Sequence, residues 1–173
     1  MKRKVLLALC LTALSLSIHA QSLSVYVNDQ SQTETNIRNA PKGKVVERIP
    51  QGYTAMLEVE NPVNGWWRIC DNSYFSIDNN GYEGIVKLKG SNKGYWIHSS
   101  VITVDTRNYA GQTLYLYQQP DTKSRKVYTI SSEMSLRPLE VKGDWVKCRT
   151  YTGNNVGWIQ AEWLCGNALT NCN

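Results

Sequence analysis

Short runs of alternating apolar and polar residues, separated by clusters of Gly, Asn, Pro and Asp, make up most of this chain. Such runs are typical of β-strands, and few apolar stretches recur every three to four residues as in helices. The sequence therefore predicts an all-β protein. In the run NGWWRIC, neighbouring side chains of a strand point to opposite faces. We expect Trp67 and Ile69 in a core and Trp66 on the outward face.

The same pattern returns about eighty residues later, where VNGWWRIC aligns with KGDWVKCR. Both read aromatic, apolar, basic, apolar after a Gly-containing turn. Trp145 aligns with Trp66 and is expected to face outward. Val146 and Cys148 align with Trp67 and Ile69, so they are expected in a core.

The repeat extends to both sides of this strand. Ile37 and Leu116 occupy matching positions and are expected to be buried. Three further pairs of segments align: NIRNAP (36–41) with YLYQQP (115–120), LEV (57–59) with LEV (139–141), and GYWIHSSVI (94–102) with VGWIQAEWL (156–164). Each copy has about five short strands, too few for an open sheet without exposed edges. The sequence therefore predicts two tandem small β-barrels.

The first copy carries about 17 extra residues within the stretch of about residues 71–93. DNNG, at residues 78–81, is a hairpin-turn signal, so we expect a lengthened hairpin projecting from the first barrel. It is a surface elaboration, a segment packed against the second barrel, or a wall of a binding groove, and the pattern does not separate these.

The ordered set of motifs, occurring twice, resembles the bacterial SH3 domain. The resemblance covers residues 34–103 and 112–165, although the second copy has YLYQQP where the family usually begins with Asn-x-Arg. It implies SH3-like barrels at residues 21–105 and 106–173. It also implies an exported bacterial protein that binds wall fragments or peptides, often beside cell-wall hydrolases. No hydrolase segment accompanies the two copies here.

Residues 1–20 read as a secretory signal peptide: Lys2, Arg3 and Lys4 precede an apolar run, and Ala20 supplies the small residue before cleavage. An uncleaved anchor is the alternative. We expect a periplasmic or secreted protein with no transmembrane span. Without the leader, sixteen basic residues face fourteen acidic ones, a net charge of +2. No concentrated basic patch is visible, so a nucleic-acid partner is not expected.

Four cysteines remain after the leader: Cys70, Cys148, Cys165 and Cys172. An exported chain can oxidise them. Cys165 and Cys172 enclose only a short, turn-rich loop beside the C-terminus, so we expect a disulfide between these two. Two reduced thiols are the alternative, because spacing alone does not prove a bridge.

Catalytic and metal-binding patterns are absent from the sequence. His98 is the one histidine outside the leader, and a structural or solvated role fits it better than catalysis. A thiol hydrolase would need His98 near Cys70 or Cys148. No paired Cys/His spacing for zinc, HExxH motif or phosphate loop is found. We expect no enzyme activity, metal or cofactor.

The predicted function is an exported binding module that recognises an envelope peptide or a peptidoglycan fragment through aromatic grooves. A structural subunit of an envelope complex is the alternative, and a thiol-dependent hydrolase is less favoured. Trp66, with Tyr82 and with Tyr95 or Trp96, is expected to line the main groove. Trp66 and Trp145 could instead both cover the barrel interface or an exposed edge. The candidate binding residues are Trp66, Tyr74, Phe75, Tyr82, Tyr95, Trp96, Trp145 and Trp158. The sequence leaves the ligand and the oligomeric state undetermined.

Overall fold

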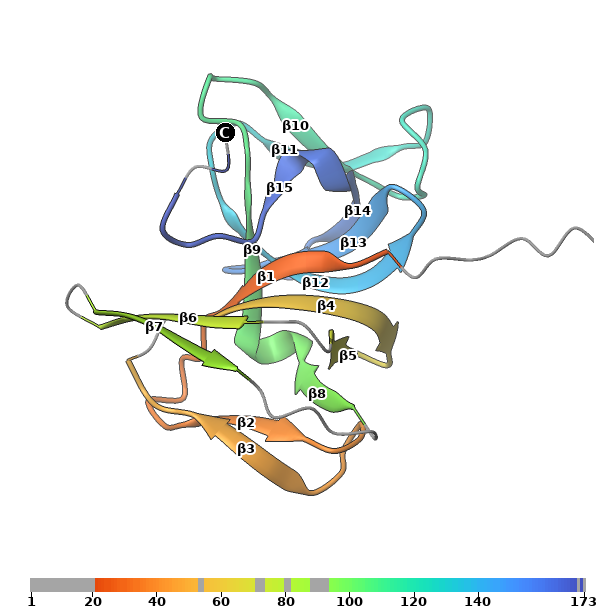
Figure 1. Ribbon diagram of the computed structural model, residues 1–173. Coiled ribbons are helices and arrows are strands. Elements are labelled where there is room, and N and C mark those ends of the chain that lie inside the picture. The colour runs from red at the N-terminus through yellow and green to blue at the C-terminus, as the bar shows by residue number, and fades with distance from the viewer. Residues whose placement is uncertain are drawn as a thin grey trace, which may run out of the picture.

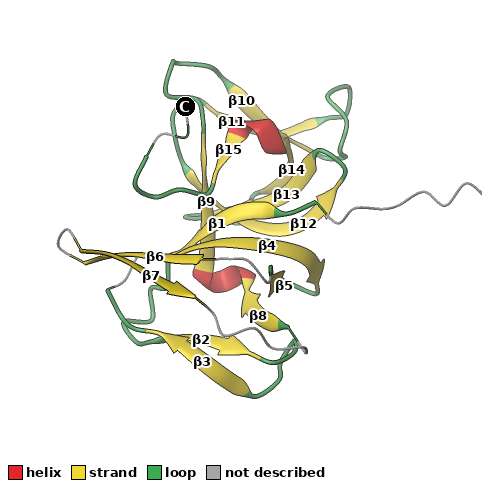
Figure 2. Ribbon diagram, viewed as in Figure 1, coloured by secondary structure: helices red, strands yellow, loops and turns green. Residues whose placement is uncertain are grey.

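The computed structural model describes residues 21–52, 55–70, 74–79, 82–87, 94–170 and 172, with the backbone alone in 74–79 and 82–87. The described part is almost entirely β-structure, with two single-turn 3-10 helices (Figure 2). The predicted leader, residues 1–20, lies outside the described residues. Within them, no helix is long and apolar enough to span a membrane.

Strands of the first half of the chain alternate with short turns, as the alternating pattern predicts. The elements are β1 (Leu23–Val27), β2 (Thr35–Arg38), β3 (Val45–Ile49), β4 (Met56–Val63), β5 (Trp66–Ile69), β6 (Tyr74–Asn79), β7 (Tyr82–Lys87), β8 (Tyr95–His98), η1 (Ser99–Val101) and β9 (Ile102–Thr106).

The second half repeats this series without a counterpart of the β6–β7 hairpin. Its elements are β10 (Leu114–Tyr117), β11 (Lys126–Ile130), β12 (Ser135–Lys142), β13 (Trp145–Thr150), β14 (Val156–Gln160), η2 (Ala161–Trp163) and β15 (Leu164–Cys165). The predicted all-β class is confirmed.

In the described part of the chain, thirteen strands form one antiparallel sheet in the order β11-β10-β14-β13-β12-β9-β1-β4-β5-β8-β2-β3, with β15 also pairing with β9. Read outward from the centre, both halves follow the same series, since β1-β4-β5-β8-β2-β3 mirrors β9-β12-β13-β14-β10-β11. The strand order thus reproduces the internal repeat. Figure 1 shows one set above and the other below the central strands β1, β4 and β12.

β9 belongs to both sets. Its residues Ile102 and Thr103 pair with β1, Val104 and Asp105 pair with β12, and its last residues pair with β15. β9 is therefore the last strand of the first half, the position that β15 holds in the second half. It is also the first strand of the second half, the position that β1 holds in the first. The boundary predicted between residues 105 and 106 falls inside this shared strand, which crosses from one half to the other in Figure 1.

The predicted strand parity is confirmed. Trp67, Ile69, Val146 and Cys148 are each at most 1% exposed, and Ile37 and Leu116 are fully buried. These residues join one continuous hydrophobic cluster that runs through both halves. Because β9 contributes the buried Ile102 and Val104 to this cluster, the two halves share a core as well as a strand.

The two LEV triplets do not correspond, contrary to the sequence alignment. Leu57 pairs with Val25 of β1, and its counterpart in the second half is Leu136, which pairs with Val104 of β9. β4 and β12 have the same order of buried, half-buried and exposed residues over eight positions. Pro138 takes the buried place of Val59, so the second identical triplet lies three residues beyond the segment that corresponds to Leu57–Val59 in the structure.

Trp67 links the two halves through its indole nitrogen. The indole N–H donates to Ser99 Oγ at 3.1 Å and to the Pro138 carbonyl on β12 at 3.2 Å. The Ser99 hydroxyl in turn donates to the Gly65 carbonyl at 2.8 Å. A buried donor without partners would be costly. Here one acceptor is a backbone carbonyl, and the other is a hydroxyl that is itself held by a backbone carbonyl.

A second polar link lies beside β9. The Tyr26 hydroxyl of β1 donates to the Asp105 carboxylate at 2.9 and 3.0 Å, and Ser135 Oγ of β12 donates to the same carboxylate at 2.6 Å. Burial raises the pKa of Tyr26 to about 12, so the phenol keeps its proton as a donor. One carboxylate thereby joins three central strands.

The insertion forms the predicted hairpin. β6 and β7 pair in antiparallel register from Tyr74–Lys87 to Asn79–Tyr82, as a two-stranded sheet separate from the large one. The predicted DNNG turn lies at its tip, with Asn80 and Gly81 outside the described residues. Figure 1 shows the hairpin projecting from the side of β4.

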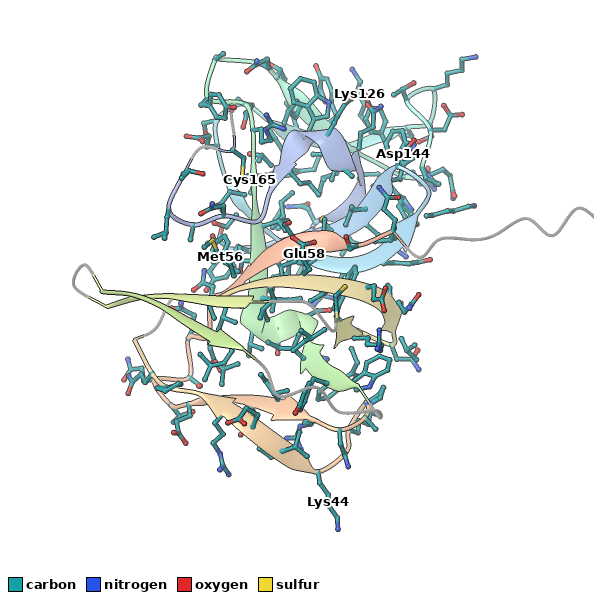
Figure 3. The ribbon with its side chains drawn as sticks, viewed as in Figure 1. Lys44, Met56, Glu58, Lys126, Asp144 and Cys165 are labelled. Atoms are coloured by element: carbon teal, nitrogen blue, oxygen red, sulfur yellow. A yellow bond between two sulfur atoms is a disulfide. The ribbon has the colours of Figure 1, made fainter. Side chains whose placement is uncertain are left out.

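The predicted disulfide between Cys165 and Cys172 is present, with the two Cα atoms 5.7 Å apart. Cys165 is buried in β15, and Figure 3 shows it in the half of the molecule that carries the C-terminus. The bridge ties the last residues to the strand that pairs with β9.

We predict that Trp67→Ala lowers the free energy of unfolding by about 3–5 kcal/mol, because a large buried ring leaves a cavity. Urea unfolding followed by circular dichroism measures the loss. Trp67→Phe is the matched control: it keeps most of the packing but removes the indole donor, so it should be intermediate. A Trp67→Ala variant that melts with the wild type would contradict the burial of this ring.

We predict that Cys172→Ser lowers the free energy of unfolding by about 2–3 kcal/mol at most, because so short a loop restricts the unfolded chain only modestly. Peptide mapping without reductant should recover Cys165 linked to Cys172 in the wild type. Recovery of Cys70 linked to Cys148 in their place would refute the assignment.

Candidate functional site

Trp66 lies in an open groove of about 340 Å³ on the outward side of β5. Trp66 pairs with His98 of β8, and directly opposite residues of an antiparallel pair share a face. The described residues that line this Trp66 groove are Asp29, Asn36, Arg38, Lys42, Trp66, His98, Ser100 and Val101. The outward position predicted for Trp66 thus places it in a groove and not at the junction of the halves.

Two side chains position the Trp66 ring. The His98 ring meets it edge-on, with centroids 4.9 Å apart and planes at 60°. The Arg38 guanidinium carbon lies 5.8 Å from its centroid, within the range of a cation–π contact. The half-buried indole is therefore held between an imidazole and a cation, with part of its surface open to the groove.

The turn between β2 and β3 orients Arg38. Arg38 Nη1 donates to the Gly43 carbonyl at 2.7 Å, and the backbone amide of Lys44 donates to Asn39 Oδ1 at 3.0 Å. A side chain at Gly43 would place its Cβ 2.4 Å from Asn39 Oδ1, so Asn39 would have to move and its bond to the Lys44 amide would be disturbed. The turn also carries Lys42 to the groove.

His98 is a titratable residue of the groove whose ring is uncharged near neutral pH. Its Nδ1 accepts the backbone N–H of Ser100 at 3.2 Å, which caps η1, and lies 2.8 Å from Ser100 Oγ. Burial lowers the pKa of His98 below its usual value of 6.5, which favours the uncharged ring near pH 7. Because Nδ1 accepts from the backbone, the neutral ring carries its hydrogen on Nε2.

Asp29 supplies the negative charge of the groove. Burial by itself would raise its pKa. The backbone N–H of Ser31, 2.9 Å from Oδ1, and the Thr35 hydroxyl, 2.9 Å from Oδ2, outweigh burial, so the pKa of Asp29 lies below its usual value. The carboxylate therefore stays ionised at neutral pH, with both oxygens already hydrogen-bonded.

The equivalent place in the second half has different chemistry. Trp145 pairs with Gln160, and Tyr117 pairs with Trp158 where Arg38 pairs with Trp96. The Tyr117 ring meets Trp145 edge-on at 5.7 Å and Tyr115 at 6.2 Å. We call the surface formed by Tyr115, Tyr117 and Trp145 the Trp145 face. It is aromatic where the Trp66 groove is charged.

The two surfaces lie toward opposite ends of the molecule. Lys44 belongs to the turn of the Trp66 groove, and Lys126 Nζ stands 3.4 Å from the Tyr115 centroid on the Trp145 face. Figure 3 shows Lys44 and Lys126 at opposite ends of the structure. The two surfaces can therefore bind separate ligands.

The remaining predicted binding residues on β8 and β14 divide between faces. Trp96 is half-buried and pairs with Arg38 and Arg68 on the outward side. Tyr95 packs against the core cluster on the opposite side, because it follows the parity of Ile97. Trp158 is buried, only 6% exposed, with Lys147 Nζ 5.7 Å from its ring. Of these three, Trp96 is the one that shares the face of Trp66.

The predicted aromatic residues of the insertion lie in the hairpin. Tyr74 and Phe75 begin β6, and Tyr82 begins β7 next to the turn at the tip. Their side chains lie outside the described residues. In Figure 1 the β6–β7 hairpin projects to the side away from β5 and β8. Whether Tyr82 contributes to the groove therefore stays a prediction, and the described lining comes from β2, β5, β8, η1 and the loops before and after β2.

Sequence analysis did not assign Arg38, Lys42, Asp29 or Asn36 to a site. The available signal was the Asn-x-Arg start of the first copy, Asn36-Ile37-Arg38, where the second copy has Tyr115-Leu116-Tyr117. With Ile37 and Leu116 buried, the flanking pair of each triplet faces outward. The polar pair of the first triplet and the aromatic pair of the second therefore indicated that the two outward surfaces have different chemistry.

The residues of a thiol nucleophile are not brought together. His98 pairs with Trp66 at the start of β5, whereas Cys70 follows the other end of that strand, about 13 Å away at strand spacing. Cys148 is fully buried, and burial raises the pKa of its thiol. In the described ranges, no group of three or more His, Cys, Asp or Glu residues could hold a metal ion.

We predict that stability falls with pH below about 6.5 partly through His98. Because the folded pKa of His98 is depressed, the unfolded chain binds the proton more readily, and stability is lost as pH falls through the folded pKa. His98→Gln, which copies the second half, should show a smaller difference in urea midpoint between pH 7.5 and 5.5. Equal pH dependence in both proteins would contradict this role. Asp29, already ionised in this range, contributes little to the difference.

Comparison with known protein families gives a match in the second half of the chain. Residues 112–164 match the family model of the bacterial SH3 domain. A search of curated proteins found no match. Among solved structures, NlpC1 from Trichomonas vaginalis is similar over 86% of this chain and 47% of its own, with 10% identity and a TM-score of 0.31. NlpC2 from the same organism is similar over 84% of this chain and 48% of its own, with 9% identity and a TM-score of 0.30. The chain spans about half the length of each, and a likeness this weak assigns no function. Residues 112–164 are thus similar in sequence to bacterial SH3 domains.

Proposed function

We propose that this protein is an exported, non-enzymatic binding module that recognises a peptide or peptidoglycan fragment of the bacterial envelope. The second half supports this proposal directly, because residues 112–164 match the bacterial SH3 family, whose members bind cell-wall material. The first half repeats the strand order of the second. We therefore propose that it is a second SH3-like barrel, elaborated by the β6–β7 hairpin.

The observation that carries the proposal is the Trp66 groove. It combines an accessible aromatic ring with hydrogen-bonding side chains at fixed positions, as small-ligand sites do. Trp66 occupies an outward place of a strand whose Trp67 and Ile69 build the core, so the Trp66 ring is not needed to fill the interior. An aromatic ring held in this way offers contact area at low entropic cost.

A non-enzymatic role agrees with the same geometry. The register separates Cys70 from His98, and burial of Cys148 disfavours its thiolate form. Export is supported by the sequence of residues 1–20 and by the disulfide between Cys165 and Cys172, since such bonds persist in oxidising compartments.

We predict that Trp66→Ala weakens binding to purified peptidoglycan at least about tenfold while the Tm changes by only a few degrees, because the half-buried ring contributes more to the groove than to the core. Sedimentation of the protein with peptidoglycan, freed of its bound proteins, measures the affinity. Trp145→Ala is the matched variant, at the equivalent strand position on the Trp145 face.

The groove hypothesis requires Trp66→Ala to lose binding while Trp145→Ala keeps most of it. Normal binding by both variants would place the site elsewhere. If wild-type protein does not sediment with peptidoglycan but is retained by an envelope protein complex, the module is an assembly subunit and the proposed function is wrong.

A further inference from the structure

The charges of the Trp66 groove are unbalanced. Arg38 and Lys42 contribute two cations, Asp29 contributes one carboxylate, and the lowered pKa of His98 leaves that ring neutral. The Asp29 carboxylate is engaged by Ser31 and Thr35 of its own loop. In the part of the chain that the structure describes, no carboxylate pairs with Arg38 or Lys42. Among the described lining residues, the groove thus carries a net charge of +1, with neither Arg38 nor Lys42 in an ion pair.

Arg38 is prepared to bind an anion. A guanidinium has five N–H donors in a planar fork, and one nitrogen is held by the Gly43 carbonyl at 2.7 Å. That bond, with the cation–π contact to Trp66, restrains the guanidinium and leaves other donors for a ligand. Arginine held in this way suits bidentate recognition of a carboxylate.

The remaining lining restricts the kind of anion. Trp66 and Val101 offer apolar surface next to the cations, which suits a carboxylate carried on a short aliphatic group. Asp29 lies in the same groove and repels a second negative charge, which disfavours phosphate dianions and polyanions. The second half lacks this arrangement, because Tyr117 and Gln160 replace Arg38 and His98.

From these contacts we infer that the Trp66 groove binds the free C-terminal carboxylate of a short peptide, with Arg38 as the anion-binding residue and Trp66 as the platform for the last side chain. This inference rests on the proposed function and narrows it, since it names the part of an envelope peptide that the first half recognises. The Trp145 face does not share this preference.

The test compares N-acetyl-trialanine with N-acetyl-trialanine amide in NMR titrations of the purified protein. The two probes differ only in the terminal carboxylate. The indole N–H signal of Trp66, assigned with Trp66→Phe, reports occupancy of the groove. We expect the acid to shift this signal and the amide to bind at least about tenfold more weakly. Inorganic phosphate should compete poorly.

Arg38→Gln should weaken binding of the acid at least about tenfold and remove the difference between acid and amide. Arg48→Gln is the matched control, because it removes the same charge from an exposed residue of β3 that pairs with Glu34 at 3.6 Å. It should leave both affinities within about twofold. Arg38→Lys should keep part of the preference, since it retains the charge without the fork.

Equal binding of acid and amide, no shift of the Trp66 signal by millimolar acid, or an equal loss in Arg48→Gln would overturn the inference. The peptidoglycan sedimentation assay separates this failure from failure of the proposed function. Wild-type protein that sediments with peptidoglycan but does not distinguish acid from amide keeps its proposed function and loses the carboxylate preference. Protein that does not sediment loses the function itself.

Discussion

The shared strand β9 is the constraint on which the rest of the structure depends. A five-residue strand pairs with β1, β12 and β15, so neither half of the sheet is complete without it. Its buried side chains also belong to the core that runs through both halves. The halves therefore cannot separate as two independently folded domains joined by a linker would, because separation would expose both backbone hydrogen-bonding groups and apolar side chains.

Two groups of hydrogen bonds, one buried and one half-buried, fix the geometry of this hydrophobic junction. The Trp67 indole reaches across to the Pro138 carbonyl, and the Asp105 carboxylate gathers Tyr26 and Ser135 from the strands on either side. Apolar contacts tolerate sliding, whereas hydrogen bonds require particular distances and angles. These contacts therefore hold the two halves in one relative position, which also fixes the separation of the Trp66 groove from the Trp145 face.

One backbone arrangement supports two surfaces of different chemistry. Corresponding inward positions of the two halves both hold apolar residues, as Ile37 and Leu116 or Val59 and Pro138 show. Close packing of the core restricts the size and polarity of these side chains. Outward positions have no such restriction. At the place where one half has Arg38 and His98, the other has Tyr117 and Gln160, and the strand pairing is the same. The chemistry of each surface can change without altering the fold beneath it.

Local alternation of residues was enough to determine the all-β class, the internal repeat, the inward side of Trp67 and the hairpin of the insertion, because each depends on neighbours along the chain. The short Cys165–Cys172 loop was predictable for the same reason. The LEV triplets misled, since the correct correspondence of Leu57 with Leu136 depends on pairing to β1 and β9. The sharing of β9, the burial of Trp158 and the meeting of Asp29, Arg38, Lys42 and His98 around Trp66 were decided by tertiary structure. These residues come from separate strands and loops, and no period or spacing in a sequence states which strands will lie side by side or which side chains will cover one another.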